Sequence, residues 1–214
     1  MEEKLFKEQI IVCLGGPPFS GKDKHGELLA KYIQDNTSLA RTLYYDNGQG
    51  LRNTLRDERF TEHMKNILDK SMNTDGKTVP AMTTIRGLTE FLFGANDGNT
   101  HFILKGPFRN TEEPWLFIQF ANEYFPKVPR YFIRLNISDD IIRQRFNSET
   151  RPNRPDDVQE KLEKRIEAYE NTNEIYDGIV KSPFFIPIDI DGNRDISEVQ
   201  ESIRSWLSFF EAEK

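Results

Sequence analysis

The sequence predicts an α/β fold in which helices sandwich a parallel sheet of five strands. Short apolar runs alternate with stretches of helical spacing along the whole chain, which is typical of repeated βαβ units. The apolar runs are nearly continuous, as expected for strands that helices cover on both faces. The 214 residues suffice for one such domain with small insertions, and a 12% aromatic share favours an ordered core.

Five apolar runs predict the strands, and they are Ile10 to Leu14, Ala40 to Tyr45, Thr100 to Leu104, Tyr131 to Asn136 and Phe184 to Ile188. The clearest helix spans Asp156 to Lys181, where apolar residues recur at three-to-four spacing and the opposite face is charged. The last helix begins near Asp195, which can cap it together with Glu198. Cys13 lies within the first run and is expected to be a small buried side chain.

Two segments fit the alternation poorly. Residues 46–93 contain helical patterns without a strand, and residues 147–155 are polar. We expect both to be insertions over the edge of the sheet, a helical one and a short lid. Residues 1–45, 94–146 and 156–214 then form the core of a single domain.

Composition excludes several classes of function. The formal net charge of -6 argues against a nucleic-acid partner, which a uniformly basic surface would attract. Apolar runs fall short of the roughly 20 residues that span a bilayer, and the first residues lack the features of a signal peptide. One cysteine and three histidines are too few for a structural zinc site. We expect a cytoplasmic monomer with small-molecule ligands and no membrane partner.

A phosphate-binding loop follows the first predicted strand. Gly16, four intervening residues, Gly21 and Lys22 form the motif, and a helical pattern comes next. Glycines let successive amides face inward, the helix N-terminus adds positive potential, and the lysine ammonium reaches the terminal phosphates. The expected ATP-binding residues of this loop are Gly16, Pro17, Pro18, Phe19, Ser20, Gly21, Lys22, Asp23 and Lys24.

One position of the motif departs from the usual pattern. Asp23 follows the lysine where a serine or threonine commonly helps to hold magnesium or phosphate. A carboxylate about 4 Å from a phosphate would cost about 4 kcal/mol at an effective dielectric of 20. We therefore expect Asp23 to face away from the phosphates.

The chain resembles the nucleoside monophosphate kinases, and adenylate kinases in particular, over nearly its whole length. Most of the matching blocks are individually weak, but they occur in the family's order. They are Gly15 to Lys22, Asn47 to Arg52, Gly76 to Pro80, Lys105 to Asn110, and Arg154 to Asp157 followed by Arg165. The resemblance implies a phosphate-loop NTPase-type fold with a monophosphate-binding insertion at 46–93 and a lid at 147–155. It also implies transfer of the terminal phosphoryl group of ATP to a nucleoside monophosphate.

The resemblance carries roles to particular residues. It implies catalytic roles for Lys22, Arg109, Arg154 and Arg165, and donor contacts for Arg145 and Arg151. The implied monophosphate site consists of Asn47, Arg52, Val79, Gly106, Arg109 and Glu113. Guanidinium groups suit such a reaction without reference to any family, because they hold phosphate oxygens bidentately and keep their charge.

Several positions depart from the family's pattern. Gln49 and Lys105 replace acidic residues that orient magnesium-bound water, so Mg²⁺ is expected with ATP but with altered, weak or absent use. Glu113 replaces a glutamine that reads adenine, so it either selects another base or caps the following helix. These losses leave an alternative function open, a nucleotide-binding module of the same fold with weakened catalysis.

Overall fold

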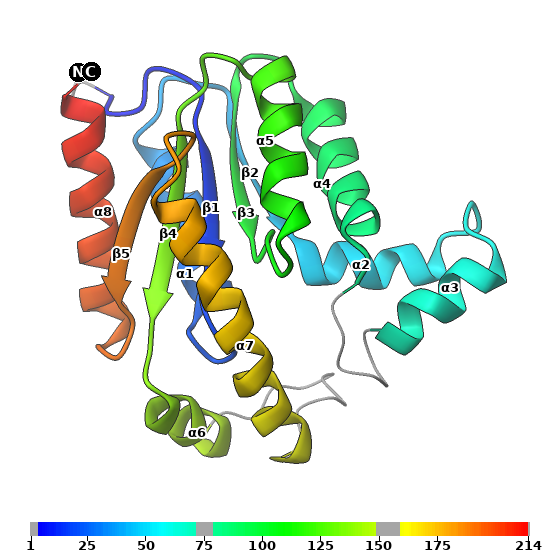
Figure 1. Cartoon of the computed structure of the whole chain (residues 1–214). Coiled ribbons are helices and arrows are strands. Elements are labelled where there is room, and N and C mark those ends of the chain that lie inside the picture. Colours follow the sequence, from blue (N-terminus) through cyan, green and yellow to red (C-terminus); the bar gives the residue numbers. More distant parts are fainter. Residues whose placement is uncertain (1–3, 72–78, 149–158, 214) are drawn as a thin grey trace.

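The computed structural model describes residues 4–71, 79–148 and 159–213. Its centre is one sheet of five parallel strands in the order β2-β3-β1-β4-β5 (Figure 1). The strands are β1 (Ile11–Gly15), β2 (Arg41–Asp46), β3 (Thr100–Lys105), β4 (Arg130–Asn136) and β5 (Ile186–Asp191). The predicted fold class is confirmed. The fifth strand begins later than predicted, because Phe185 contributes to the apolar core from the turn before it.

Helices cover both faces of the sheet. They are α1 (Lys22–Asp35), α2 (Asn47–Arg56), α3 (Glu62–Asp69), α4 (Ala81–Ala95), α5 (Glu112–Tyr124), α6 (Asp139–Ser148), α7 (Gln159–Val180) and α8 (Ile196–Ala212). Side chains of α4, α5 and α7 pack on one face, and those of α1 and α8 pack on the other (Figure 1). The predicted cap of the last helix is confirmed, since Asp195 and Glu198 form a capping box there.

The core consists of two apolar layers separated by the sheet. Alternate residues of β1 divide between them: Ile11 and Cys13 face α4, α5 and α7, whereas Val12 and Leu14 face α1 and α8. Cys13 is fully buried as predicted, and burial raises the pKa of its thiol. Burial on both faces explains why the strand sequences read as continuous apolar runs.

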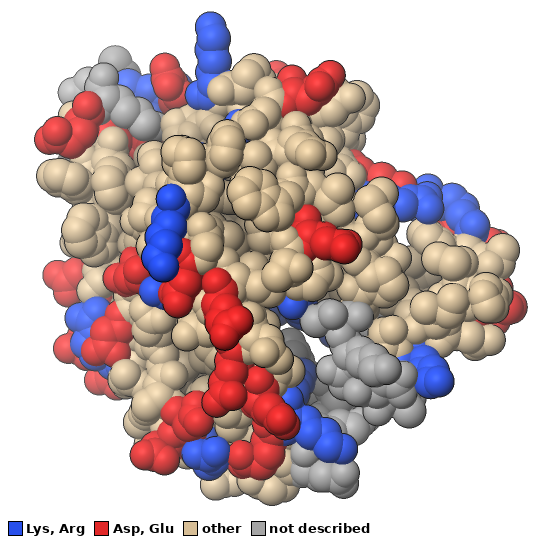
Figure 2. All heavy atoms as spheres, viewed as in Figure 1, with Lys and Arg blue, Asp and Glu red and all other residues tan. Residues whose placement is uncertain are grey.

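The long helix α7 shows its predicted two-sided character. Leu162, Ile166, Tyr176 and Ile179 are buried. Acidic side chains gather along its outer face (Figure 2), and they include the exposed Glu163, Glu167, Glu170 and Glu174. None of the described helices is long and apolar enough to cross a bilayer.

The segment predicted to be a helical insertion contains α2, α3 and most of α4, and its described residues include no strand residue except Asp46, which ends β2. Helix α4 buries Leu88 and Leu92 in the layer that covers the sheet. Helices α2 and α3 extend beyond the sheet instead (Figure 1), and with Val79 they share a small apolar cluster that includes Leu51 and Leu68. Of the predicted lid, residues 149–155 lie outside the described part of the chain, and Asn147 and Ser148 belong to α6.

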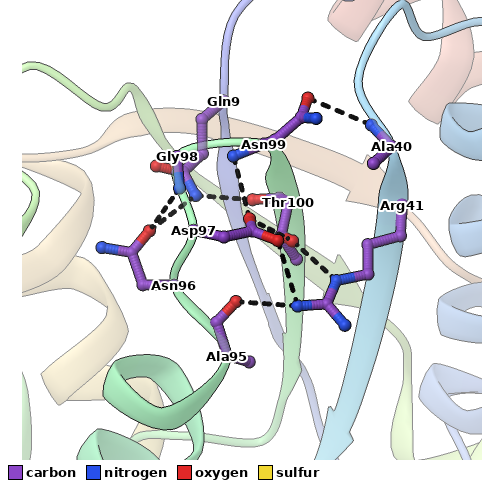
Figure 3. A network of polar contacts seen from close by, with 9 residues as sticks. All are labelled: Gln9, Ala40, Arg41, Ala95, Asn96, Asp97, Gly98, Asn99 and Thr100. Carbon is purple, nitrogen blue, oxygen red and sulfur yellow. Dashed lines mark hydrogen bonds and ion pairs between the residues drawn. The ribbon is translucent and has the colours of Figure 1, made fainter.

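Polar contacts close the edge of the sheet where β2 and β3 begin (Figure 3). The Arg41 guanidinium donates to Thr100 Oγ1 at 2.9 Å and to Asp97 Oδ2 at 3.2 Å. Gln9, just before β1, donates to the Thr100 carbonyl at 2.6 Å. These contacts fix the turn between α4 and β3. Because all five strands are parallel, their carboxyl ends lie together at the opposite edge, where open α/β sheets bind ligands.

Candidate functional site

The candidate site lies at the carboxyl ends of β1, β2 and β3. Helix α1 leaves β1 on one face of the sheet, and α5 leaves the neighbouring β3 on the other face. Connections that diverge in this way open a crevice between the two strand ends. The loop between β1 and α1, which carries the predicted phosphate motif, lines this crevice.

The backbone of the phosphate loop is held in an uncommon conformation. Gly16 and Gly21 have positive φ angles of 145° and 81°, and Phe19 has one of 59°. A non-glycine residue in the left-handed region costs about 1–2 kcal/mol. Packing offsets this cost, since the Phe19 ring lies 5.4 Å from the ring of Phe146 in a cluster with residues of α6 and α7. The phenylalanine therefore anchors the loop to these helices.

Lys22 directs its ammonium group back into the loop. Its Nζ donates to the carbonyls of Gly16 at 2.6 Å and Pro17 at 2.5 Å, and to Ser20 Oγ at 3.1 Å. Lys22 is also the first residue of α1, whose N-cap Gly21 offers no side-chain cap to the first amides. An anion within the loop would meet this ammonium together with the positive end of the helix. Binding of phosphate by this loop stays a prediction.

Arg145 links three segments behind the loop. Its guanidinium donates to the carbonyls of Phe19 at 3.2 Å and Gly192 at 2.8 Å. The arginine of α6 thus lies between the phosphate loop and the turn after β5. Its predicted contact with the donor base stays a prediction.

Two buried residues, His25 of α1 and Tyr176 of α7, have no role in the predicted site, but both lie against the phosphate loop. His25 lies under Gly21 and contacts the side-chain amide of Gln200 at 2.9 Å through Nδ1. Burial, with a smaller effect of Arg145, lowers the pKa of His25 to about 4, so its ring is neutral near pH 7.

Tyr176 of α7 contacts the loop from the other side of the sheet. Its hydroxyl accepts a hydrogen bond from the Gly16 amide, and a Cβ atom at Gly15 would lie only 2.9 Å from its ring. Gly15 must therefore be glycine for the helix to pack here. Helical spacing marks Tyr176 as buried, but no pattern in the sequence indicates that it touches the loop.

Lys105 is the centre of the charge arrangement beside the loop. It ends β3 and pairs in register with Asp46 at the end of β2, so both side chains point to the face that α1 covers. Its Nζ donates to Asp46 Oδ2 at 2.8 Å and also to Asp23 Oδ1 in the first turn of α1. As expected, Asp23 is engaged away from the loop interior, and its partner is the lysine that departs from the family's pattern.

Asp46 serves two structural purposes at once. Its Oδ1 accepts the Gln49 amide at 3.2 Å as the N-cap of α2, while its Oδ2 accepts from Lys105. Burial acts to raise the pKa of this carboxyl, but the Lys105 charge and these hydrogen bonds outweigh it and lower the pKa. Asp46 is therefore ionised and committed to both partners.

The described residues beside the loop do not fit a Mg²⁺ ion. Mg²⁺ binds through carboxylates and phosphates in octahedral geometry, and the two nearby carboxylates, Asp23 and Asp46, are both engaged by Lys105. Gln49 uses its side chain to contact Asn53 and Arg52 on α2. Among the described residues no group of three or more histidine, cysteine or acidic side chains could hold a metal ion.

A second cationic group lies at the start of α2. A Cβ atom at Gly48 would lie 3.3 Å from Asp46 Oδ1, 3.5 Å from Arg52 Nη1 and 3.7 Å from Arg109 Nη2, so the two guanidinium groups converge on this glycine beside the Asp46 carboxylate. Asn47 donates from Nδ2 to the Gly106 carbonyl at 3.1 Å and ties α2 to the turn after β3. The structure thus brings together Arg52 and Arg109, which the sequence places 57 positions apart.

Glu113 contacts the turn that precedes its own helix, whereas Asn110 Oδ1 accepts the first amides of that helix. Glu113 Oε2 accepts the backbone amides of Arg109 at 2.5 Å and Asn110 at 3.3 Å, and the side chain is fully buried. Burial raises the pKa of this carboxyl, although these amides and the Thr84 hydroxyl oppose the rise. A role for Glu113 in reading the acceptor base stays a prediction.

The remaining predicted site residues lie elsewhere. Val79 is buried with Leu51 and Leu68, Lys24 is exposed on α1, and Arg165 is half-buried on α7. Arg151 and Arg154 lie outside the described residues.

The chain is similar to two known kinases. No model of a known sequence family matches the chain. The chain is 28% identical over 197 residues to adenylate kinase 1 of Schistosoma mansoni, a match that covers 91% of each chain. Among solved structures it is similar to a gluconokinase from Sinorhizobium meliloti 1021, with a TM-score of 0.60 and 13% identity over 97% of this chain and 96% of that one. The predicted resemblance to an adenylate kinase is thereby confirmed, and the chain shares its fold with a solved kinase structure.

Proposed function

We propose that this protein is a nucleoside monophosphate kinase that uses ATP as its phosphoryl donor. The observation that carries the proposal is the presence of two cationic groups at one edge of the sheet. Lys22 lies in the phosphate loop at the end of β1, and Arg52 converges with Arg109 where β2 and β3 end. A kinase for nucleotides needs one such group for the triphosphate and another for the acceptor phosphate. The similarity to an adenylate kinase over most of the chain supports phosphotransferase activity.

The proposed reaction needs no covalent enzyme intermediate. A phosphate oxygen of the monophosphate attacks the terminal phosphorus of ATP, and the bond from that phosphorus to the bridging oxygen breaks. The products are ADP and a nucleoside diphosphate. Lys22 holds the terminal phosphate of the donor, and Arg52 with Arg109 holds the acceptor in line. Such groups position the reactants and stabilise charge on the transferred group.

Two further arginines complete the proposal by resemblance. Arg154 and Arg165 occupy the family's positions for arginines that contact the transferred phosphoryl group. An arginine in this role supplies roughly 10³ to 10⁵ in rate in other phosphoryl transferases. The proposed setting is a cytoplasmic monomer whose partners are small nucleotides.

A coupled assay for diphosphate formation tests the proposal. ATP is supplied with AMP, GMP, CMP, UMP or dTMP in turn, with and without Mg²⁺. Diphosphate formation with at least one acceptor, and none without an acceptor, is the expected result. Hydrolysis of ATP without any acceptor would contradict the proposal and favour a nucleotidase.

The replacements at Gln49 and Lys105 favour one alternative, a nucleotide-binding module that has lost efficient catalysis. Calorimetric titration with ATP separates it from the kinase. ATP binding without turnover across the acceptor panel would support the module, whereas turnover with any acceptor would exclude it.

A further inference from the structure

Lys105 occupies a place where a phosphate-loop protein commonly needs negative charge for a metal ion. Its backbone pairs in register with Leu14 of β1 on one side and Asp46 of β2 on the other. The next residue, Gly106, donates its amide to the Leu14 carbonyl at 2.9 Å, so the end of β3 adjoins the start of the phosphate loop. Asp23, which contacts the Lys105 ammonium, directly follows the loop lysine Lys22.

The Lys105 ammonium is fixed in this position. Only 9% of its side chain is exposed, and carboxylates hold its Nζ from two elements, Asp46 at the end of β2 and Asp23 in α1. Turning the ammonium away would leave a buried charge without a partner and would separate two carboxylates from their shared cation. Both changes are unfavourable in a poorly solvated place.

We infer that Lys105 closes the cation position beside the phosphate loop, so that the loop binds the triphosphate of a nucleotide without a divalent metal ion. A divalent cation here would have to take Asp23 and Asp46 from the ammonium and lie next to its charge. The ammonium already supplies a fixed positive charge, and a serine or threonine ligand is replaced by the aspartate that holds it. The inference rests on the nucleotide site of the proposed function, but not on turnover.

Titration calorimetry with ATP, in excess EDTA or in excess MgCl₂, tests the inference on the whole protein. For the wild type, the dissociation constant for ATP should differ by less than about twofold between the two conditions. For Lys105→Met, the two carboxylates lose their shared cation, so ATP should bind about tenfold or more weakly in EDTA, and Mg²⁺ should restore much of the loss. Lys105→Arg keeps the charge and should retain metal-independent binding.

A matched control removes a cation from the same two strands at their other end. Arg41 pairs with Asp97 at the start of β2 and β3 (Figure 3), and Arg41→Met should leave the effect of Mg²⁺ on ATP binding unchanged. Thermal unfolding of each variant checks that Lys105→Met folds. The wild-type titrations test the inference even if Lys105→Met does not fold.

The outcomes separate this inference from the proposed function. Wild-type binding that is tenfold or more tighter with Mg²⁺ than with EDTA would overturn the inference while leaving the kinase proposal in place. Equal binding by Lys105→Met in both conditions would overturn the role of Lys105. Metal-independent binding without turnover would support the inference and contradict the kinase proposal. If ATP bound neither in EDTA nor in MgCl₂, both would be overturned.

Discussion

The sequence predicts some contacts of the individual side chains at the candidate site and does not predict others. The motif predicts that Lys22 faces the phosphate loop, because glycine spacing and a following helix leave little freedom for its direction. The sequence does not predict that Asp23 and Asp46 share Lys105. That contact depends on the register of β2 against β3 and on the packing of α1 across them, which are set by the whole sheet.

The loop lysine gives the first prediction at this scale. Lys22→Ala should lower kcat/KM for phosphoryl transfer by about 10³ or more, since it removes a charge that acts on the transferred group. The unfolding midpoint should change little, because Lys22 lies at the partly exposed start of α1 and not in the apolar core. Steady-state kinetics and thermal melting measure the two effects. Lys31→Ala, at an exposed position of α1, is the control, and near-wild-type turnover by Lys22→Ala would reject the site.

Glu113 gives a second prediction, which separates its two interpretations. If it only stabilises the turn before α5, it should tolerate Glu113→Gln with unchanged acceptor preference, since the amide oxygen can still accept from the Arg109 and Asn110 amides. Glu113→Ala should lower the free energy of unfolding by about 1–3 kcal/mol, because those buried amides lose their acceptor. Urea unfolding and the acceptor panel provide the measurements. A shift of Glu113→Gln towards AMP would instead show that this residue reads the base.

Whole elements position the loop from both faces of the sheet. Helix α7 reaches Gly16 through Tyr176, α6 reaches the Phe19 carbonyl through Arg145, and α8 supports His25 through Gln200. Helical periodicity predicts which face of α7 is buried, but the partner of each buried residue depends on the crossing of helix and sheet. Sequence spacing alone does not determine that crossing.

Two tyrosines of α7 allow a matched test of this support. Tyr176→Phe should reduce the free energy of unfolding by about 0.5–1.5 kcal/mol, since it removes a buried hydrogen bond to the Gly16 backbone. Tyr169→Phe should be neutral or slightly stabilising, because the described residues supply no hydrogen-bond partner for its buried hydroxyl. Chemical denaturation of both variants makes the comparison. Equal losses would show that the Tyr176 hydroxyl contributes nothing specific.

For the molecule as a whole, the sequence predicts the fold class and strand number because both depend on local patterns. Continuous apolar runs at β1, β3 and β4 require cover on both faces, and only a layered α/β arrangement gives it. The order β2-β3-β1-β4-β5 is not predicted, because it depends on the direction in which each connection crosses the sheet. For the same reason the sequence does not predict that α4 completes a covering layer.

The buried histidine links stability of the whole fold to pH. The pKa of His25 is about 4 in the folded protein and about 6.5 when unperturbed, so the unfolded chain takes up a proton first as the pH falls. The contribution of the neutral His25 ring to the free energy of unfolding is fully present above pH 6.5 and is lost between pH 6.5 and 4. Urea unfolding at pH 7 and pH 5 should show that the wild type loses about 1–2 kcal/mol more than His25→Gln. His63→Gln, at an exposed position of α3, is the control. The prediction would be contradicted if the free energy of unfolding changed equally with pH in the wild type and in His25→Gln.

The buried thiol of Cys13 has a practical consequence for studying motion. It is the chain's single cysteine, it is fully enclosed in the sheet, and its raised pKa keeps it protonated and unreactive. Maleimide dyes should therefore attach only to cysteines that are introduced at the surface. Replacing the exposed Asn66 on α3 and Glu123 on α5 would give a labelled pair without altering the native background. Energy transfer between the two dyes could then report whether α3 approaches the sheet when ATP and an acceptor are added.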